Sequence, residues 1–179
     1  MKHTLSVLAL SLLVACTAAP SGGQPSGKAS LETYANDDIG YTIDVPSDWT
    51  ITESDTVVTD GYTAVGTSFG YPAGRDRSAL GEATVNVASM PECPSQDGGT
   101  MDDVNGQRFM RTEFDGVGAG NRYRGETYAI ERGGSCVVVT LFTHSCNLGP
   151  DCGDDRQEPY SYDDTLFKLK TVFESLTFR

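Results

Sequence analysis

The chain has 179 residues, of which 38% are hydrophobic and 21% are charged, and it carries a net charge of −12 at pH 7 with a pI near 4.4. Such an acidic chain is not expected to bind nucleic acid, because proteins that contact the phosphate backbone present a basic face. Its apolar content is too high for a disordered protein, and its length fits one domain.

The first 16 residues have the pattern of a bacterial lipoprotein signal. A short basic start is followed by a leucine-rich apolar run over residues 5–14, which is too short to cross a membrane and is typical of a signal peptide. The run ends in Leu-Val-Ala-Cys at 13–16, which resembles the lipobox, where a cysteine thiol accepts a diacylglycerol and becomes the first residue after cleavage. The alternative is an ordinary secretory signal with a chance cysteine.

These features predict three segments. Residues 1–15 are expected to be a lipoprotein signal peptide, residues 16–30 a lipidated Cys16 with a flexible linker rich in Pro, Gly and Ser, and residues 31–179 a single domain. Acyl chains on Cys16 would anchor the protein on the extracytoplasmic side of a membrane in the cell envelope, so the membrane itself is a predicted partner.

The other cysteines agree with an oxidising compartment. An even number of them in an exported domain predicts disulfide bonds, here between Cys93, Cys136, Cys146 and Cys152. The short loop after Cys146 contains a Gly-Pro turn and favours the pair Cys146–Cys152, which leaves Cys93 with Cys136. A zinc site is the alternative, but the paired knuckle spacing it needs is absent, so no metal is expected here.

Alternating apolar residues and turn signals predict strands along most of the domain. Asn105-Gly106 and Gly133-Gly134 are hairpin turns, and the second joins a long hairpin at the expected centre of the sheet, made of residues 122–132 and 135–145. Other strands are expected at 40–46, 49–52, 63–71, 83–90 and 107–114.

One helix is clearly indicated near the C-terminus. It is expected to begin at Tyr162 with an acidic first turn, which suits the helix dipole. One apolar face follows at spacings of three and four, made of Leu166, Leu169, Val172, Phe173 and Leu176. Strands followed by a helix predict an antiparallel α+β domain.

Two motifs at the ends of the domain carry a family resemblance. The segment GYTIDVPSDWTI at 40–51 is similar to the start of PsbP-like domains, and LFKLKTVFESLTF at 166–178 resembles their closing helix. The resemblance implies a twisted antiparallel sheet flanked by helices, with an amphipathic helix at the C-terminus. It also implies a place among bacterial exported proteins and lipoproteins without an assigned activity, and it favours Trp49 as a core anchor rather than a ligand platform.

A serine hydrolase is the alternative function. Residues 66–70 fit G-x-S-x-G with Ser68 as the nucleophile, and His144 is the one histidine that follows the signal segment. The motif should lie on a strand–turn–helix elbow, whereas Tyr-Pro-Ala-Gly follows here, so the geometry is wrong for that chemistry and no catalytic residue is assigned.

Two charged clusters are further candidates. Arg108, Arg122 and Arg124 could form a patch for an anion or a partner, although pairing with Glu113, Glu126 and Glu131 is the favoured explanation. Carboxylates around Cys152 could hold calcium, but the spacing of a calcium loop is absent and a solvated loop is favoured; these carboxylates are Asp151, Asp154, Asp155 and Glu158.

The sequence therefore favours a membrane-anchored envelope lipoprotein that acts as a non-enzymatic binding or assembly module. It would need no cofactor, bind a protein partner in the envelope and bind no nucleic acid. An envelope hydrolase using Ser68 and His144 is the alternative.

Overall fold

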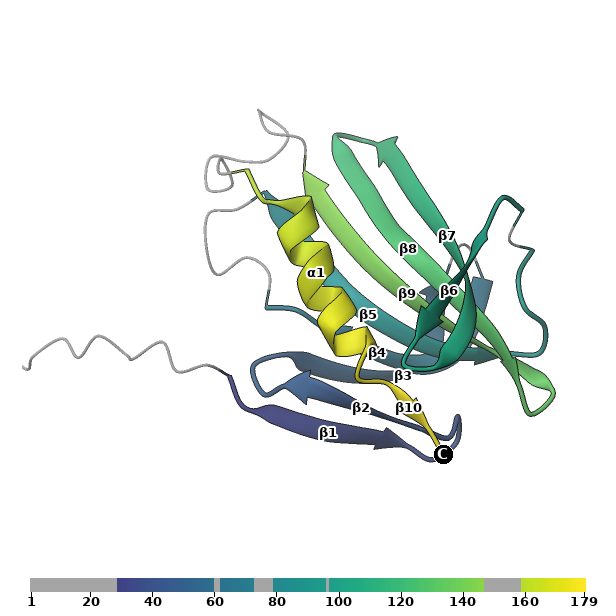
Figure 1. The fold of residues 1–179 in the computed structure, drawn as a ribbon. Helices are drawn as coiled ribbons and strands as arrows, with labels where there is room; N and C mark the ends of the chain where they lie inside the picture. The colour runs from purple at the N-terminus through teal and green to yellow at the C-terminus, as the bar shows by residue number, and fades with distance from the viewer. Residues whose placement is uncertain (1–28, 60–61, 73–78, 96, 147–158) are drawn as a thin grey trace, which may run out of the picture.

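Two antiparallel sheets and one helix make up the described part of the chain (Figure 1). The structure is a computed structural model and describes residues 29–59, 62–72, 79–95, 97–146 and 159–179. Its strands are β1 (Leu31–Asn36), β2 (Tyr41–Pro46), β3 (Thr50–Thr59), β4 (Tyr62–Gly70), β5 (Leu80–Met90), β6 (Thr100–Val104), β7 (Gln107–Gly118), β8 (Asn121–Arg132), β9 (Ser135–Cys146) and β10 (Thr177–Phe178). The helix is α1 (Tyr162–Phe173).

The large sheet has seven strands in the order β3-β4-β5-β9-β8-β7-β6. The predicted long hairpin is confirmed as β8 and β9, and β9 is the central strand. Asn105, Gly106, Gly133 and Gly134 all have positive φ, as their two-residue hairpin turns require. The β-branched residues of β9 account for its central position, because Val and Thr pack well on a sheet that is buried on both faces.

The small sheet has three strands in the order β1-β2-β10. Its middle strand alternates, so that Tyr41, Ile43 and Val45 are buried while the residues between them are partly exposed. Pro46 ends this strand, as the sequence predicts.

The helix α1 lies across one face of the large sheet, with the small sheet beside it at one end of the helix (Figure 1). Ser161 caps it, because its side chain accepts a hydrogen bond from the Asp164 backbone N–H. Leu169, Val172 and Phe173 are buried against the sheet, which confirms the predicted apolar face. We call this side of the large sheet the helix face and the opposite side the distal face.

The main core fills the space between the helix face, α1 and the small sheet. It includes Val85 and Val87 from β5, Val139 and Leu141 from β9, and Phe173 from α1. A smaller cluster lies on the distal face, made of Ala64, Ala88, Met90, Ala129, Cys136 and Val138.

The expected α+β fold with a sheet flanked by helices is wrong. In the described residues one helix packs on the large sheet, and the rest of the helix face is covered by a second sheet instead of further helices. The prediction missed β1, β6 and β10, and it placed the strand at 40–46 in a single sheet with the others. A strand of two residues such as β10 has no periodicity to detect, yet it completes the small sheet by pairing with Tyr41 and Thr42.

None of the helices in the described part of the chain is long and apolar enough to cross a membrane.

Candidate functional site

Ser68 and His144 do not form a catalytic pair. Ser68 lies on β4 opposite Asn86, and Asn86 lies opposite Thr140 on β9. His144 is four residues further along β9, so two strand spacings and four residues separate the side chains by roughly 16 Å. The G-x-S-x-G motif lies inside strand β4 instead of at a strand–helix elbow.

The three arginines do not form one patch. Arg122 donates two hydrogen bonds to Asp115, with Nε to Oδ1 at 3.0 Å and Nη2 to Oδ2 at 2.5 Å, and Arg124 lies 3.3 Å from the same carboxylate. The Arg124 guanidinium also lies 3.6 Å from the ring centroid of Tyr162. Arg108 lies opposite Asp103 in the register of β7 and β6, on the distal face, whereas Arg122 and Arg124 are on the helix face. Cross-strand charge pairing is therefore present, but the acid that pairs with Arg122 and Arg124 is Asp115.

The disulfide Cys93–Cys136 is confirmed, with a Cα–Cα distance of 4.9 Å. Cys146 is also disulfide-bonded, while Cys152 lies outside the described residues, as do Cys16, the signal segment and the carboxylates of the calcium alternative. Trp49 is half-buried at the rim of the main core and packs edge-on against Tyr71, with ring centroids 5.7 Å apart.

A buried ionic cluster joins the sheet to the helix around Glu126. The Glu126 side chain is 4% exposed and lies 2.6 Å from Arg111 and 3.0 Å from Lys170 of α1. Tyr128 donates a hydrogen bond of 2.5 Å to the second carboxylate oxygen, and Arg111 also pairs with Glu113. Sequence reasoning treated Glu126 only as a possible partner of the nearby arginines, because it lies two residues after Arg124 on an alternating strand. Its actual ionic partners, Arg111 and Lys170, come from two other elements.

The cluster keeps Glu126 ionised. Burial alone would raise the pKa of Glu126, but hydrogen bonds from Arg111, Tyr128 and Lys170 outweigh burial and hold its pKa below the usual value. Burial and the neighbouring Glu126 carboxylate raise the pKa of Tyr128, so that this hydroxyl stays protonated and donates. Both carboxylate oxygens of Glu126 are engaged, Oε1 by Arg111 and Oε2 by Tyr128 and Lys170, and the cluster therefore acts as a structural link and not as a free base.

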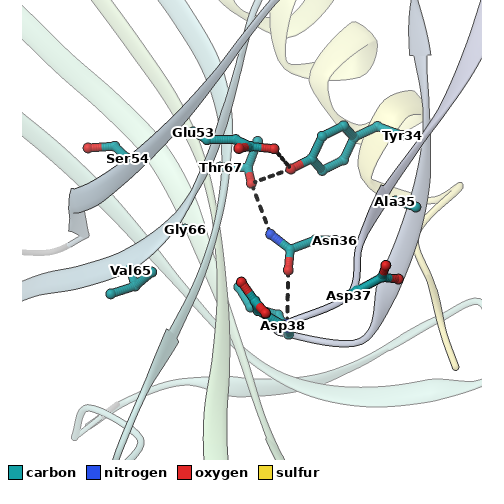
Figure 2. A pocket seen from close by; sticks show the side chains of 11 residues that line it. Tyr34, Ala35, Asn36, Asp37, Asp38, Glu53, Ser54, Val65, Gly66 and Thr67 are labelled. Carbon is teal, nitrogen blue, oxygen red and sulfur yellow. Dashed lines mark hydrogen bonds between the residues drawn. The ribbon is translucent and has the colours of Figure 1, made fainter.

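A pocket of about 320 Å³ opens where the small sheet meets the edge of the large sheet (Figure 2). The Tyr34 hydroxyl of β1 donates to Glu53 of β3 at 2.6 Å and lies 3.2 Å from the Thr67 hydroxyl of β4. Asn36 donates to the Thr67 hydroxyl at 3.3 Å, and its carbonyl oxygen accepts from the backbone N–H of Ile39. This chain of hydrogen bonds ties β1 to β3 and β4.

The pocket has an acidic rim. Asp37 and Asp38 follow β1, and Glu53 faces them from β3 (Figure 2). Burial and the hydrogen bond to Glu53 raise the pKa of Tyr34, so its hydroxyl remains a donor. No sequence motif marks this pocket, because its residues come from three strands that pair in two different sheets.

No family model matches the chain, and no curated protein matches it. Among solved structures, the fold is similar to the cyanobacterial PsbP protein (CyanoP) of Synechocystis, with a TM-score of 0.49 and 17% identity over 90% of this chain and all of that chain. It is also similar to a crystal structure from Bacteroides thetaiotaomicron, with a TM-score of 0.42 and 10% identity over 78% of this chain and 45% of that chain. The first neighbour is a PsbP protein, and PsbP-like domains are the family that the segments at 40–51 and 166–178 resemble in sequence. Similarity at this level assigns the chain to no family and transfers no activity.

Proposed function

We propose that this protein is a lipoprotein of the cell envelope and that its folded domain is a non-enzymatic binding or assembly module. The observation that carries the proposal is the Leu-Val-Ala-Cys sequence at 13–16 after a short leucine-rich run. The first strand begins at Leu31, so a linker of about 14 residues would separate the lipid from the domain. The bridge Cys93–Cys136 fits an exported protein, because such bonds persist in oxidising compartments.

The hydrolase alternative loses its support, because the strand register keeps Ser68 and His144 apart. A reactive serine probe distinguishes the two functions directly. A binding module leaves the probe unreacted, whereas labelling at Ser68 that is lost in Ser68→Ala would contradict the proposal.

The anchor is tested by Cys16→Ser, compared with Cys16 in the wild-type chain. The serine variant is expected to appear in the soluble fraction or to keep its uncleaved signal, since a hydroxyl does not take up the thioether-linked lipid. A variant that remains membrane-bound with normal cleavage would mean that the anchor lies elsewhere.

The binding role is tested by a photo-crosslinking amino acid placed at Asp38, on the rim of the pocket, and at Phe167, which is 71% exposed on the outer side of α1. A module with a defined partner gives an adduct from one surface and not from the other. Adducts of equal intensity from both positions, or from neither, would count against a specific partner.

A further inference from the structure

The pocket beside Tyr34 is open to solvent and is lined by apolar as well as charged side chains (Figure 2). Its volume of about 320 Å³ is at the lower end of the range for small-molecule sites. Ala35, Ile39 and Val65 form the apolar part of the lining, and Val65 is 58% exposed. A ligand that fills this pocket therefore needs a hydrocarbon part in addition to polar groups.

The charged side chains of the pocket are acidic. Asp37, Asp38 and Glu53 line it, and none of its described lining residues is lysine, arginine or histidine. Arg179 reaches Asp37 from outside the lining, with Nη1 2.6 Å from Oδ1. Asp38 is exposed and has no hydrogen bond or ion pair among the described residues. Three carboxylates and one guanidinium leave a charge of −2, which favours a cationic ligand.

The two carboxylates without an arginine partner lie at separate places in the pocket. Asp38 belongs to the turn between β1 and β2, whereas Glu53 lies on β3. A chain of four hydrogen bonds runs from Glu53 through the side chains of Tyr34, Thr67 and Asn36 to the turn at Ile39 (Figure 2). A ligand that contacts both carboxylates must therefore carry positive charge at two separated points.

This chain of hydrogen bonds has an unused group at its inner end. Tyr34 donates its proton to Glu53, so its contact of 3.2 Å with Thr67 uses the Thr67 proton. The Tyr41 hydroxyl is fully buried without a hydrogen-bond partner. Burial raises the pKa of Tyr41, and the other groups that act on it are Thr67, Tyr34 and Glu53, so its hydroxyl is directed at the inner wall of the pocket. An ammonium group that donates to the Tyr34 oxygen from the pocket frees the Thr67 proton to turn toward Tyr41.

We propose that this pocket binds a linear aliphatic amine with at least two ammonium groups. One ammonium group lies at Glu53 and Tyr34, a second lies at Asp38, and the methylene chain between them contacts Val65. Each ammonium group has three N–H donors, which suit carboxylate and hydroxyl oxygens. The inference goes beyond the binding of a protein partner and does not depend on the lipid anchor, because the pocket belongs to the folded domain.

The experiment is calorimetric titration of the full chain with putrescine, cadaverine and spermidine at low ionic strength, where exposed charges are least screened. Butylamine has the same four-carbon chain as putrescine with one charge, and adipate has a negative charge at each end. At least one of the three amines is expected to bind at least tenfold more tightly than butylamine, and adipate is expected not to bind.

Asp38→Asn is the decisive variant. It is expected to weaken binding of the tightest amine at least fivefold without a change in melting temperature, because the Asp38 side chain makes no contact that the fold needs. Asp48→Asn is the matched control, since Asp48 is an exposed residue between β2 and β3 that does not line the pocket. The control removes the same charge from the chain and is expected to leave the affinity unchanged.

Three results in the wild type would overturn the proposal. These are no binding of any of the three amines, equal affinity for butylamine, and equal affinity for adipate. Unchanged affinity in Asp38→Asn would also overturn it. Equal weakening in Asp38→Asn and Asp48→Asn would do the same, because the net charge of the chain and not the pocket would then attract the amine.

Discussion

Glu126 and Lys170 form an ion pair of 3.0 Å that joins β8 to α1 across the edge of the core. The other carboxylate oxygen of Glu126 contacts Arg111, and the Glu126 side chain is nearly inaccessible to water. Removing one partner from a buried ion pair leaves an uncompensated charge and usually costs about 3–5 kcal/mol. The helix is therefore fixed to the sheet by charge as well as by its apolar face.

The first prediction concerns Glu126→Gln. The variant keeps the shape of the side chain but leaves Arg111 and Lys170 facing a neutral amide, so the free energy of unfolding is expected to fall by about 3 kcal/mol. Chemical denaturation measures the change. Glu113→Gln is the control, because the Glu113 side chain is 69% exposed and shares the same arginine. Equal loss in the two variants would mean that burial does not set the strength of the Glu126 contacts.

The second prediction concerns acid. Because the pKa of Glu126 is lowered in the folded state, its contribution to stability is complete above the unfolded value of about 4.3 and is lost as the pH falls through the folded value. The wild type should lose more free energy of unfolding below about pH 4 than Glu126→Gln does. If the free energy of unfolding falls equally with pH in the two proteins, a carboxylate other than Glu126 is responsible for the loss of stability in acid.

The sequence predicts those parts of the fold whose signal is local. The turn at Gly133-Gly134 and the apolar spacing of α1 can be detected within about 15 consecutive residues, and both are confirmed. The small sheet cannot be detected in this way, because it depends on contacts such as the hydrogen bond from the Asp44 backbone N–H to Ser175, which are 131 residues apart in the chain.

The candidate sites, too, depend on contacts between residues that are far apart in the sequence. The pocket beside Tyr34 combines residues of β1, β3 and β4, which belong to two different sheets, so no single stretch of sequence indicates it. Glu126 has three partners on three elements, so only the register and the position of α1 reveal that it is buried. Arg122 and Arg124 are two residues apart, so an alternating strand brings them to one face, but their partner Asp115 depends on where the hairpin turns, and that turn lies at Ala119-Gly120.

The third prediction concerns the helix. Phe173 is 1% exposed and packs against Phe109 and Tyr128, with centroids 5.4 and 4.6 Å away. Phe173→Ala should lower the free energy of unfolding by about 3–5 kcal/mol, the usual cost of truncating a buried phenylalanine. Phe167→Ala on the exposed side of the same helix should change it by less than about 0.5 kcal/mol. Similar melting temperatures for the two variants would contradict the packing of α1.

The fourth prediction concerns Gly125 on β8. A Cβ atom on Gly125 would lie 2.0 Å from the Leu141 carbonyl oxygen and 2.6 Å from the Phe114 ring. Because one of these atoms belongs to the backbone of the central strand, Gly125→Ala is expected to cost at least about 1–3 kcal/mol, the usual range for overpacking. Gly116→Ala on β7 meets nothing within 4 Å and should be neutral or slightly stabilising. A Gly125→Ala protein as stable as the wild type would show that β8 and β9 can separate at this point.

The last prediction concerns the bridge Cys93–Cys136. It joins the segment after β5 to the start of β9 with a sequence separation of 43 residues. Closing a loop of that length removes chain entropy from the unfolded state worth about 4 kcal/mol. Cys93→Ala/Cys136→Ala should therefore lower the melting temperature by roughly 8–16 °C, since 1 kcal/mol corresponds to about 2–4 °C in a chain of this size.

Treatment with a reductant distinguishes the contribution of this bridge from that of the bridge at Cys146. Dithiothreitol should lower the melting temperature of the wild type mainly by reducing Cys93–Cys136. The alanine pair lacks this bond, so dithiothreitol should lower its melting temperature much less. A full response in the alanine pair would mean that the bond at Cys146 carries the redox sensitivity. Non-reducing peptide mapping provides the independent check, because a peptide that links Cys93 to any cysteine other than Cys136 would contradict the pairing.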